Sequence, residues 1–470
     1  MSQEKKKKEK KELQPWVKLV GSAIMIGLLL FLGNFAVRFC LGLFVTGDDY
    51  ILSHPGQSVA TPTEPGDAPE NTLPPESDEV REVGRASILA TGDLMMHMPT
   101  VRSGNQNGSY NFEYIFSYIG DYVKKADYAV VNLETTLSGT DGKQYTGYPK
   151  FNSPDAVASA VKSSGFDLLL TGNNHCYDYG TAGMLRTLEV IKAAGLDTLG
   201  TYASTDEQQY LVREAGGVKI GMLSYTFADI GENQNQPTVN GLATNVDAAG
   251  LINTFDYDKL DLFYTEIRNQ IDAMRASGAE AIVLFIHWGD EYTTKVTNTQ
   301  KEMAQKLCNL GVDVIAGSHP HVVQTMDLLT STEDESHRTL VLYSMGNFLS
   351  NQRHDNISLT TGQSEDSLLF TFTFVKYSDG TVMLEQAAIQ PTWVLIRGSG
   401  DGRTYHILPL DYGIDDWVTT FDLTATQAED ARKSYNRTMD IIGSDYHRVL
   451  ELLAQQTTPE DLPQFEGGVG

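Results

Sequence analysis

Short apolar runs alternate along residues 85–400 with stretches in which apolar residues recur every three or four positions. The short runs are typical of buried β-strands, and the recurring spacing is typical of helices with one buried face. The expected strands are residues 87–91, 128–132, 166–171, 218–225, 281–287, 312–317, 339–344, 368–375 and 382–390. The expected helices are residues 112–125, one that begins at Ser153-Pro154-Asp155, and residues 181–194, 257–277 and 300–310.

This order of elements predicts a layered α/β sandwich in which the later strands are partly antiparallel. Asp379 and Gly380 separate the last two strands, and we expect those strands to pair as a hairpin. Residues 205–255 contain few regular runs and are expected to form a loop-rich flap. Residues 401–470 are expected to form a helical extension, with residues 424–435 and 446–454 as the candidate helices.

The N-terminal part of the chain differs from this body. Residues 1–18 form a lysine-rich tail, and residues 19–45 are almost entirely apolar, which is long enough to cross a bilayer core of about 30 Å. The basic tail then predicts a single-pass anchor with a cytoplasmic N-terminus and an extracytoplasmic body. A cleaved signal peptide is the alternative, but it would have a shorter apolar run and a small-residue cleavage site. Residues 46–84 are rich in proline and are expected to form a disordered linker.

Charge and cysteine content exclude some classes of partner and of fold. The 470 residues include 61 acidic and 35 basic side chains, for a formal net charge of -26. A chain this acidic lacks the basic surface on which nucleic-acid affinity depends, so we expect no nucleic-acid partner. Three cysteines, Cys40, Cys176 and Cys308, do not make a disulfide framework. Free thiols are expected, with a single Cys176–Cys308 bond as the alternative.

Residues that can bind metals follow directly after five of the expected strands. Side chains at the carboxyl ends of neighbouring strands converge on one crevice in α/β folds, and Asp, Glu, Asn and His are the ligands of hydrolytic metals. The five clusters are Gly92-Asp93 with His97, Asn132-Leu133-Glu134, Gly172-Asn173-Asn174-His175, His287-Trp288-Gly289 and Gly317-Ser318-His319-Pro320-His321. Their repetition predicts a metal site at this edge of the fold.

The clusters differ in what they can contribute. Asp93 and Glu134 offer carboxylates, and Asp93 suits a terminal or bridging position on a metal. His97 is open to two readings, a metal ligand or a loop histidine without a metal role. His319 and His321 are two residues apart, and in extended geometry such a pair points to the same side, which suits one or two metals.

The cluster around His175 also predicts acid–base chemistry. Gly172 would let the chain turn sharply after its strand, and the amide oxygen of Asn174 suits a hard metal. His175 can protonate a leaving group, and Asp178 could orient its imidazole. His287 is either a ligand or a capped strand end. The sequence contains no Gly-x-Ser-x-Gly elbow and no Walker loop, so a serine hydrolase or NTPase is not supported.

Six motifs in this order resemble those of a known family. They are Gly92-Asp93, Asn132-Leu133-Glu134, Gly172-Asn173-Asn174-His175 with Asp178, His287-Trp288-Gly289 with Glu291 and Tyr292, Gly317-Ser318-His319-Pro320-His321-Val322 with Gln324, and Ser344 with Gly346-Asn347-Phe348. The chain resembles the CapA family of capsule-biosynthesis proteins, also called poly-gamma-glutamate synthesis PgsA-like proteins, over about residues 85–395. That family is similar to calcineurin-like metallophosphoesterases, which implies a four-layered α/β/β/α sandwich around a two-metal centre.

The resemblance also implies roles for single residues. It implies metal ligands at Asp93, Glu134, Asn174, His287, His319 and His321. It makes His175, together with Asp178, the general acid or phosphate-contacting group. The implied cofactor is one or two divalent ions, with Mn, Zn, Fe and Mg all open. Two positions depart from the phosphoesterases: Met95 stands where an Asp-x-His motif would place histidine, and Glu134 replaces a bridging aspartate.

Three functions follow from this reading. The first is an anchored protein that acts in the synthesis, export or attachment of poly-gamma-glutamate or another capsule polymer, with membrane-bound polymer synthase subunits as partners. The second is a metal-dependent phosphoesterase that acts on a cell-surface phosphate ester. The third is a non-catalytic scaffold that binds the polyanionic polymer in the same pocket.

Overall fold

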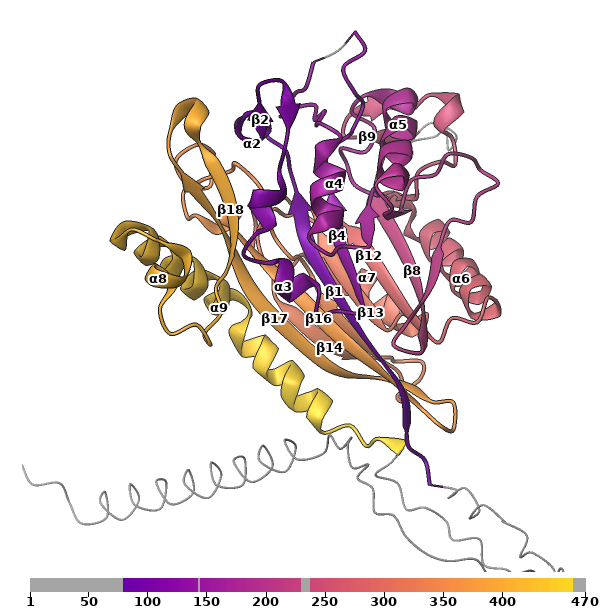
Figure 1. The fold of residues 1–470 in the computed structure, drawn as a ribbon. Coiled ribbons are helices and arrows are strands. Elements are labelled where there is room, and N and C mark those ends of the chain that lie inside the picture. The colour runs from indigo at the N-terminus through magenta and orange to yellow at the C-terminus, as the bar shows by residue number, and fades with distance from the viewer. Residues whose placement is uncertain (1–78, 143, 230–236, 460–470) are drawn as a thin grey trace, which may run out of the picture. The chain divides into compact units, whose positions relative to one another are not determined.

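The computed structural model describes residues 79–142, 144–229 and 237–459. Two seven-stranded sheets dominate this part of the chain (Figure 1). In spatial order the first sheet contains β18 (Thr404–Pro409), β17 (Val382–Arg397), β16 (Asp366–Tyr377), β1 (Glu82–Leu94), β4 (Tyr128–Leu133), β5 (Leu168–Leu170) and β6 (Asp197–Leu199). The second contains β11 (Thr254–Phe255), β8 (Val218–Phe227), β12 (Ala281–His287), β13 (Val314–Ser318), β15 (Arg338–Leu342) and β14 (Met326–Thr330), and β7 (Leu211–Ala215) also pairs with β8.

Each sheet combines parallel strands with antiparallel ones at an edge. Strands β1, β4, β5 and β6 run parallel, whereas β16, β17 and β18 are antiparallel to their neighbours. In the second sheet β8, β12, β13 and β15 run parallel, and β7 and β14 are antiparallel. The parallel strands of each sheet therefore end at a common edge, where their last side chains can meet.

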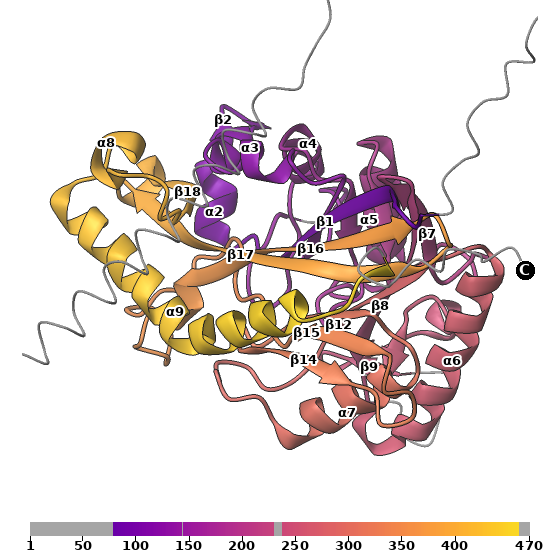
Figure 2. The same cartoon turned by 90° about the horizontal axis from the view of Figure 1, so that it is seen from below.

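The two sheets face each other, and helices cover their outer faces (Figures 1 and 2). Buried side chains from both sheets, among them Ile88, Met222 and Phe370, form one apolar core. Helices α4 (Ala156–Ser163) and α5 (Gly180–Ala193) pack on the outer face of the first sheet. Helices α6 (Leu260–Ala276) and α7 (Asn298–Asn309) pack on the second. The other elements are α2 (Met98–Ser103), β2 (Asn105–Gln106), β3 (Ser109–Tyr110), η1 (Glu113–Phe116), α3 (Gly120–Val123), β9 (Thr238–Val239), β10 (Leu242–Ala243), η2 (Val246–Ala248), η3 (Tyr257–Lys259), η4 (Gln363–Glu365), η5 (Gly400–Gly402), α8 (Trp417–Phe421) and α9 (Ala425–Ala454).

Helix α9 lies across β16, β17 and β14 and joins the core between the sheets (Figure 2). Its side chains Ile442, Val449 and Leu453 are buried in that core. A polar contact fixes it as well, since Arg437 donates to both oxygens of Asp366 at 2.7 and 2.9 Å. Burial raises the pKa of Asp366 to about 6, although Arg437 works in the opposite direction.

Replacing Arg437 by alanine should destabilise the fold by about 3 kcal/mol, because it leaves the buried Asp366 carboxylate without its cation. Replacing Lys433, which pairs with Asp430 on the exposed face of α9, should change stability by no more than about 0.5 kcal/mol. Urea unfolding of the two variants measures the difference. Equal effects would show that the Arg437 pair does not hold α9 in place.

The structure confirms a mixed α/β fold and the hairpin of β16 and β17, and it corrects several expected elements. Residues 112–125 form the short 3-10 helix η1 and the one-turn helix α3 instead of one helix, and their apolar side chains reach the core from these short elements. Residues 424–435 and 446–454 belong to the single helix α9. Strand β18 lies within the expected helical extension, and β1 begins at Glu82, inside the expected linker.

The expected anchor and most of the expected linker lie outside the described residues. Among the helices that the structure does describe, none combines the length and the apolar character needed to cross a bilayer. Cys176 and Cys308 are buried free thiols, which excludes the alternative of a bond between them. Burial raises the pKa of the Cys176 thiol to about 12, so this residue stays protonated at neutral pH.

Candidate metal centre

The six predicted ligands come together where the parallel strands of both sheets end. Asp93 and Glu134 lie at the ends of β1 and β4, and His287 is the last residue of β12. Asn174 follows β5, and His319 and His321 follow β13. All six are buried. The two sheets therefore contribute ligands to one site, although these residues are up to 228 positions apart along the chain.

One group of candidate ligand atoms belongs to Asp93, Glu134 and His287, whose atoms lie within 4.8 Å of one another. The Oε1 atom of Glu134 is buried and accepts no hydrogen bond from the described residues. It lies 3.9 Å from His287 Nε2 and 3.7 Å from His321 Nε2. Burial raises the pKa of Glu134 well above its usual range, and the carboxylate of Asp93 adds to this shift. A bound cation would remove the cost of burying both carboxylates.

A second group adjoins the first and contains Glu291, His319 and His321, again within 4.8 Å. His321 Nδ1 lies 3.0 Å from Asp93 Oδ2, which connects the two groups. Glu291 is the exposed member of this group. The sequence motif included Glu291, but sequence reasoning gave it no ligand role, because nothing local indicates that the loop after β12 turns back toward His321.

His287 is the centre of the buried contacts. Its Nε2 atom lies 3.1 Å from Asn174 Oδ1 and 3.1 Å from His319 Nδ1, and its Nδ1 atom lies 2.9 Å from Ser318 Oγ. Burial lowers the pKa of both His287 and His319 well below the usual value, so both rings stay neutral near pH 7. If Ser318 accepts the His287 Nδ1 proton, Nε2 presents a lone pair beside an amide oxygen. Such a donor set fits a divalent metal.

His319 and His321 do not have the extended geometry that the sequence reading assumed. Their φ angles are +98° and +57°, a region that residues with a side chain rarely adopt. The two imidazoles nonetheless lie in the same site, with ring centroids 5.9 Å apart. The strained backbone, rather than the two-residue alternation of a strand, brings them there.

Glycines in these motifs lie where neighbouring backbone or side chains leave no room for a Cβ atom. A Cβ atom at Gly92 would lie 1.9 Å from the carbonyl oxygen of Gly346, and one at Gly317 would lie 1.9 Å from that of Tyr343. At Gly172, which precedes the turn at residues 173–179, an added Cβ would meet Ser224 Oγ at 2.7 Å. These glycines let the ligand-bearing strand ends approach their neighbours closely.

Two asparagines that the sequence reading left without a role hold the ligands in place. Asn132 Nδ2 donates to Asp93 Oδ1 at 2.8 Å, and Asn132 Oδ1 accepts from Asn173 Nδ2 at 3.0 Å. Asn173 Oδ1 accepts from the backbone N–H of His175 at 3.1 Å. Both residues lie within the quoted motifs: Asn132 is two residues before Glu134, and Asn173 directly precedes Asn174. This proximity was the signal available in the sequence.

His175 and Asp178 form a buried pair beside the ligands. His175 Nδ1 lies 2.8 Å from Asp178 Oδ2, which also accepts from the backbone N–H of Phe151 at 2.7 Å. The ring of Phe151 packs edge-on against His175 with centroids 4.7 Å apart. This arrangement fixes the imidazole and leaves its Nε2 atom for contact with a substrate, as the predicted acid–base role requires.

His97 belongs to neither ligand group. Its Nδ1 atom accepts from the backbone N–H of Asn351 at 3.3 Å, and its ring packs edge-on against Phe151. Burial lowers the pKa of His97 to about 4, and His321 and His175 add to the shift. The structure thus gives His97 a packing position next to the site.

The metal-free chain should lose stability as the pH falls from about 6.5 to 4, because the unfolded state takes up a proton on His97 that the folded state does not accept. His287 and His319 act in the same direction. Replacing His97 by phenylalanine should flatten this part of the profile, as measured by urea unfolding after metal stripping. An unchanged pH dependence would contradict the buried neutral state of His97.

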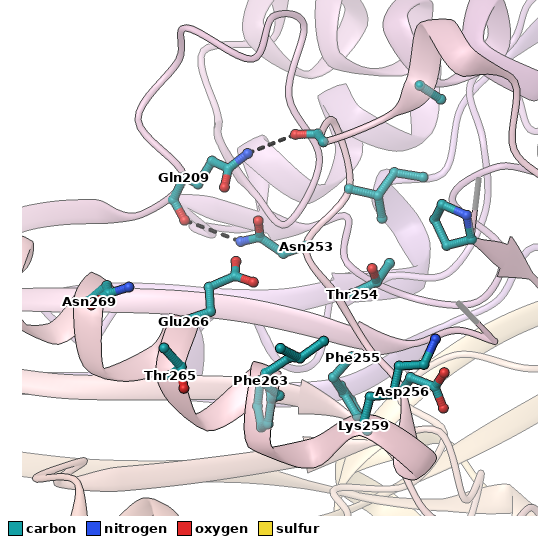
Figure 3. Close-up of a pocket in the computed structure, with 15 residues that line it drawn as sticks. Gln209, Asn253, Thr254, Phe255, Asp256, Lys259, Phe263, Thr265, Glu266 and Asn269 are labelled. Carbon is teal, nitrogen blue, oxygen red and sulfur yellow. Dashed lines mark hydrogen bonds between the residues drawn. The ribbon is translucent and has the colours of Figure 1, made fainter. Parts of the chain in front are cut away.

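A cavity of about 630 Å³ opens beside the candidate ligands. Asn174, Glu291 and His319 line it, together with residues 227–229, 238, 240–241 and 256–258. A separate cavity of about 570 Å³ lies between α6 and β11 and contains none of the predicted ligands (Figure 3). The first cavity is therefore where a substrate would reach the site.

Comparison with known proteins identifies the family. The family described as "Bacterial capsule synthesis protein PGA_cap" matches residues 87–352, which include every predicted ligand. The chain belongs to this family. The predicted resemblance to capsule-biosynthesis proteins is thereby confirmed.

Two relatives illustrate the similarity. "Capsule biosynthesis protein CapA" from Bacillus anthracis is 28% identical over 277 residues, which cover 58% of this chain and 61% of the relative. "PGA biosynthesis protein CapA" from Bacillus subtilis (strain 168) is 26% identical over 271 residues, which cover 57% of this chain and 63% of the relative. The match thus spans less than two thirds of each relative. A solved structure of a hypothetical protein from Thermus thermophilus is 14% identical, with a TM-score of 0.36, and covers 65% of this chain and 97% of that one.

Proposed function

We propose that this chain is a membrane-anchored CapA-like protein that acts outside the cytoplasm in the synthesis, export or attachment of a capsule polymer. The family and the two relatives support the link to the capsule. The apolar stretch at residues 19–45 and its basic flank support the anchor. The polymer is a polyanion such as poly-gamma-glutamate, and the partners are membrane-bound polymer synthase subunits.

The site in the body is proposed to be a metal-dependent, hydrolase-type centre. The observation that supports it best is the buried Glu134 Oε1 atom, which lacks a hydrogen bond from the described residues and faces two imidazoles. The proposed ligands are Asp93, Glu134, Asn174, His287, His319 and His321, to which the geometry adds Glu291. The two adjoining ligand groups and the two facing sheets support a metallophosphoesterase-like arrangement with two ions. When bound, such ions would activate water and stabilise developing negative charge.

The protein's own residues then have separate tasks. Asn132 holds the Asp93 carboxylate through a hydrogen bond, and Asn173 in turn holds Asn132 and the backbone N–H of His175. Asp178 keeps the His175 imidazole in one orientation, and His175 can deliver a proton to a leaving oxygen through Nε2. The cavity beside Asn174 and His319 would receive the reacting part of the substrate.

A test of the capsule role uses a capsule-forming host that carries the chain with both His287 and His319 replaced by alanine. Surface polymer should fall to the level of a deletion strain. The matched control replaces His447, which is exposed on α9 and distant from the ligands in sequence, and should leave the polymer unchanged. Normal polymer in the double variant would support a scaffold without metal chemistry. Normal polymer in the deletion strain would contradict the capsule role itself.

The second candidate function is hydrolysis of a cell-surface phosphate ester. The His175–Asp178 pair, placed next to two ligand groups, favours it. Replacing His175 by alanine should lower the turnover of an aryl phosphodiester by about 100-fold or more, while metal content, measured by elemental analysis, stays unchanged. Absence of any turnover by the metal-loaded wild-type chain would exclude this function.

A further inference from the structure

A second cavity, of about 570 Å³, lies between helix α6 and the loop that leads into β11 (Figure 3). The side chains of Phe255 and Phe263 lie at its base. Polar side chains from three separate segments face its other end, namely Gln209, Asn253 and Glu266. A concave space with an apolar wall and a few convergent polar groups is the usual form of a small-molecule site.

The side-chain N–H groups of Asn253 and Gln209 already donate hydrogen bonds within the protein. Asn253 Nδ2 donates to the hydroxyl of Tyr202 at 3.0 Å and to the backbone carbonyl of Gln209 at 3.2 Å. Gln209 Nε2 donates to the backbone carbonyl of Gly250 at 2.7 Å. Because a carbonyl can only accept, these contacts fix which end of each amide is oxygen. The amide oxygens of Asn253 and Gln209 are therefore left as acceptors.

Glu266 adds a carboxylate to this end of the cavity. Its Oε1 atom accepts from the hydroxyl of the buried Tyr225 at 2.8 Å, and its Oε2 atom accepts no hydrogen bond from the described residues. Within residues 79–142, 144–229 and 237–459, Glu266 forms no ion pair with lysine or arginine. Figure 3 shows its carboxylate directed toward the amides of Asn253 and Gln209. Burial raises the pKa of Glu266, a cost that a bound cation would offset.

The position of this cavity connects it to the metal centre. Asp256 lines both cavities, and Pro237 and Thr238, which are adjacent in sequence, line one cavity each. The two cavities are therefore neighbours, with Asp256 between them.

We propose that this second cavity binds a primary ammonium group, held by the Glu266 carboxylate and by the amide oxygens of Asn253 and Gln209. An ammonium group has three N–H donors and no acceptor, which matches three acceptors and a negative charge. A neutral hydroxyl group would leave the negative charge of the Glu266 carboxylate without a compensating positive charge. The ammonium belongs to a part of the substrate remote from the reacting bond. This last assignment rests on the proposed function, whereas binding of the ammonium group does not.

The test measures binding of 1,5-diaminopentane to the full chain by calorimetry after metal stripping, so that the amine cannot bind a metal instead. Its neutral counterpart is 1,5-pentanediol. We expect saturable binding of the diamine and at least about 10-fold weaker binding of the diol. Glu266→Gln keeps the shape and still accepts from Tyr225, but should weaken diamine binding at least about 10-fold. Asp272→Asn removes an exposed carboxylate from the same helix and should leave binding unchanged.

Three results would overturn the proposal: equal binding of diamine and diol, undiminished binding by Glu266→Gln, or no saturable binding of the diamine. Unfolding curves of Glu266→Gln show whether a loss of binding reflects a loss of fold. If the metal centre proves empty while the diamine still binds through Glu266, the proposed hydrolase site fails and the ammonium site stands.

Discussion

Replacing His287 by alanine is expected to remove bound metal from the full chain. His287 Nε2 lies next to Asn174 Oδ1, His319 Nδ1 and Glu134 Oε1. It therefore contacts candidate ligands from both sheets. Loss of even an outer partner of a ligand weakens metal binding by about 10- to 100-fold, and loss of the ligand itself should exceed about 100-fold. Elemental analysis after dialysis, together with a competition titration, measures the change.

The matched control replaces His337, a half-buried histidine whose Nε2 atom lies 3.0 Å from the backbone oxygen of Val312. This variant loses an imidazole that belongs to neither ligand group and should keep its metal. Circular dichroism of both variants establishes that they are folded. If His287→Ala retained a full complement of metal with wild-type affinity, His287 would not be a ligand.

The second large effect is expected from Gly317→Ala. The added Cβ atom would lie 1.9 Å from the carbonyl oxygen of Tyr343 and 2.6 Å from Trp288 Nε1, and these two atoms are themselves hydrogen-bonded at 2.9 Å. Backbone must therefore move at the end of β13, just before His319. We expect a loss of about 3 kcal/mol or more in unfolding free energy, at the upper end of overpacking effects, together with weaker metal binding.

Gly402→Ala is the control for this substitution. Position 402 has no heavy atom within 4 Å of an added Cβ and no left-handed φ angle, so stability should change by no more than about 0.5 kcal/mol. Urea unfolding of the two variants gives the comparison. A Gly317→Ala chain as stable as wild type would show that β13 and the Tyr343 loop are less closely packed than the structure has them.

Most of the long buried strands and the meeting of the candidate ligands could be predicted from the sequence, because both leave local signals, whereas short strands such as β6 and β11 were not expected. Buried strands appear as apolar runs, and each ligand follows such a run directly, as Asp93 and His287 do. Parallel strands end at one edge, so ligand residues at those ends were expected to meet. The structure brings all six together.

Other features depend on contacts that no local pattern reveals. The Arg437–Asp366 pair joins residues 71 positions apart and fixes α9, which looked like two separate helices in the sequence. The positive φ angles at His319 and His321 follow from their surroundings rather than from residue type. Glu291 and the glycines at 92 and 317 acquire their roles only when distant parts of the chain approach them.

The most direct test of the metal centre is an anomalous diffraction map of the full chain, collected at the absorption edge of the metal found by elemental analysis. The proposed site predicts a strong peak among Asp93, Glu134 and His287, beside Asn174, and a second peak among Glu291, His319 and His321 where two ions bind. Crystals grown with excess Mn²⁺ or Zn²⁺ that show no peak at these residues would contradict it.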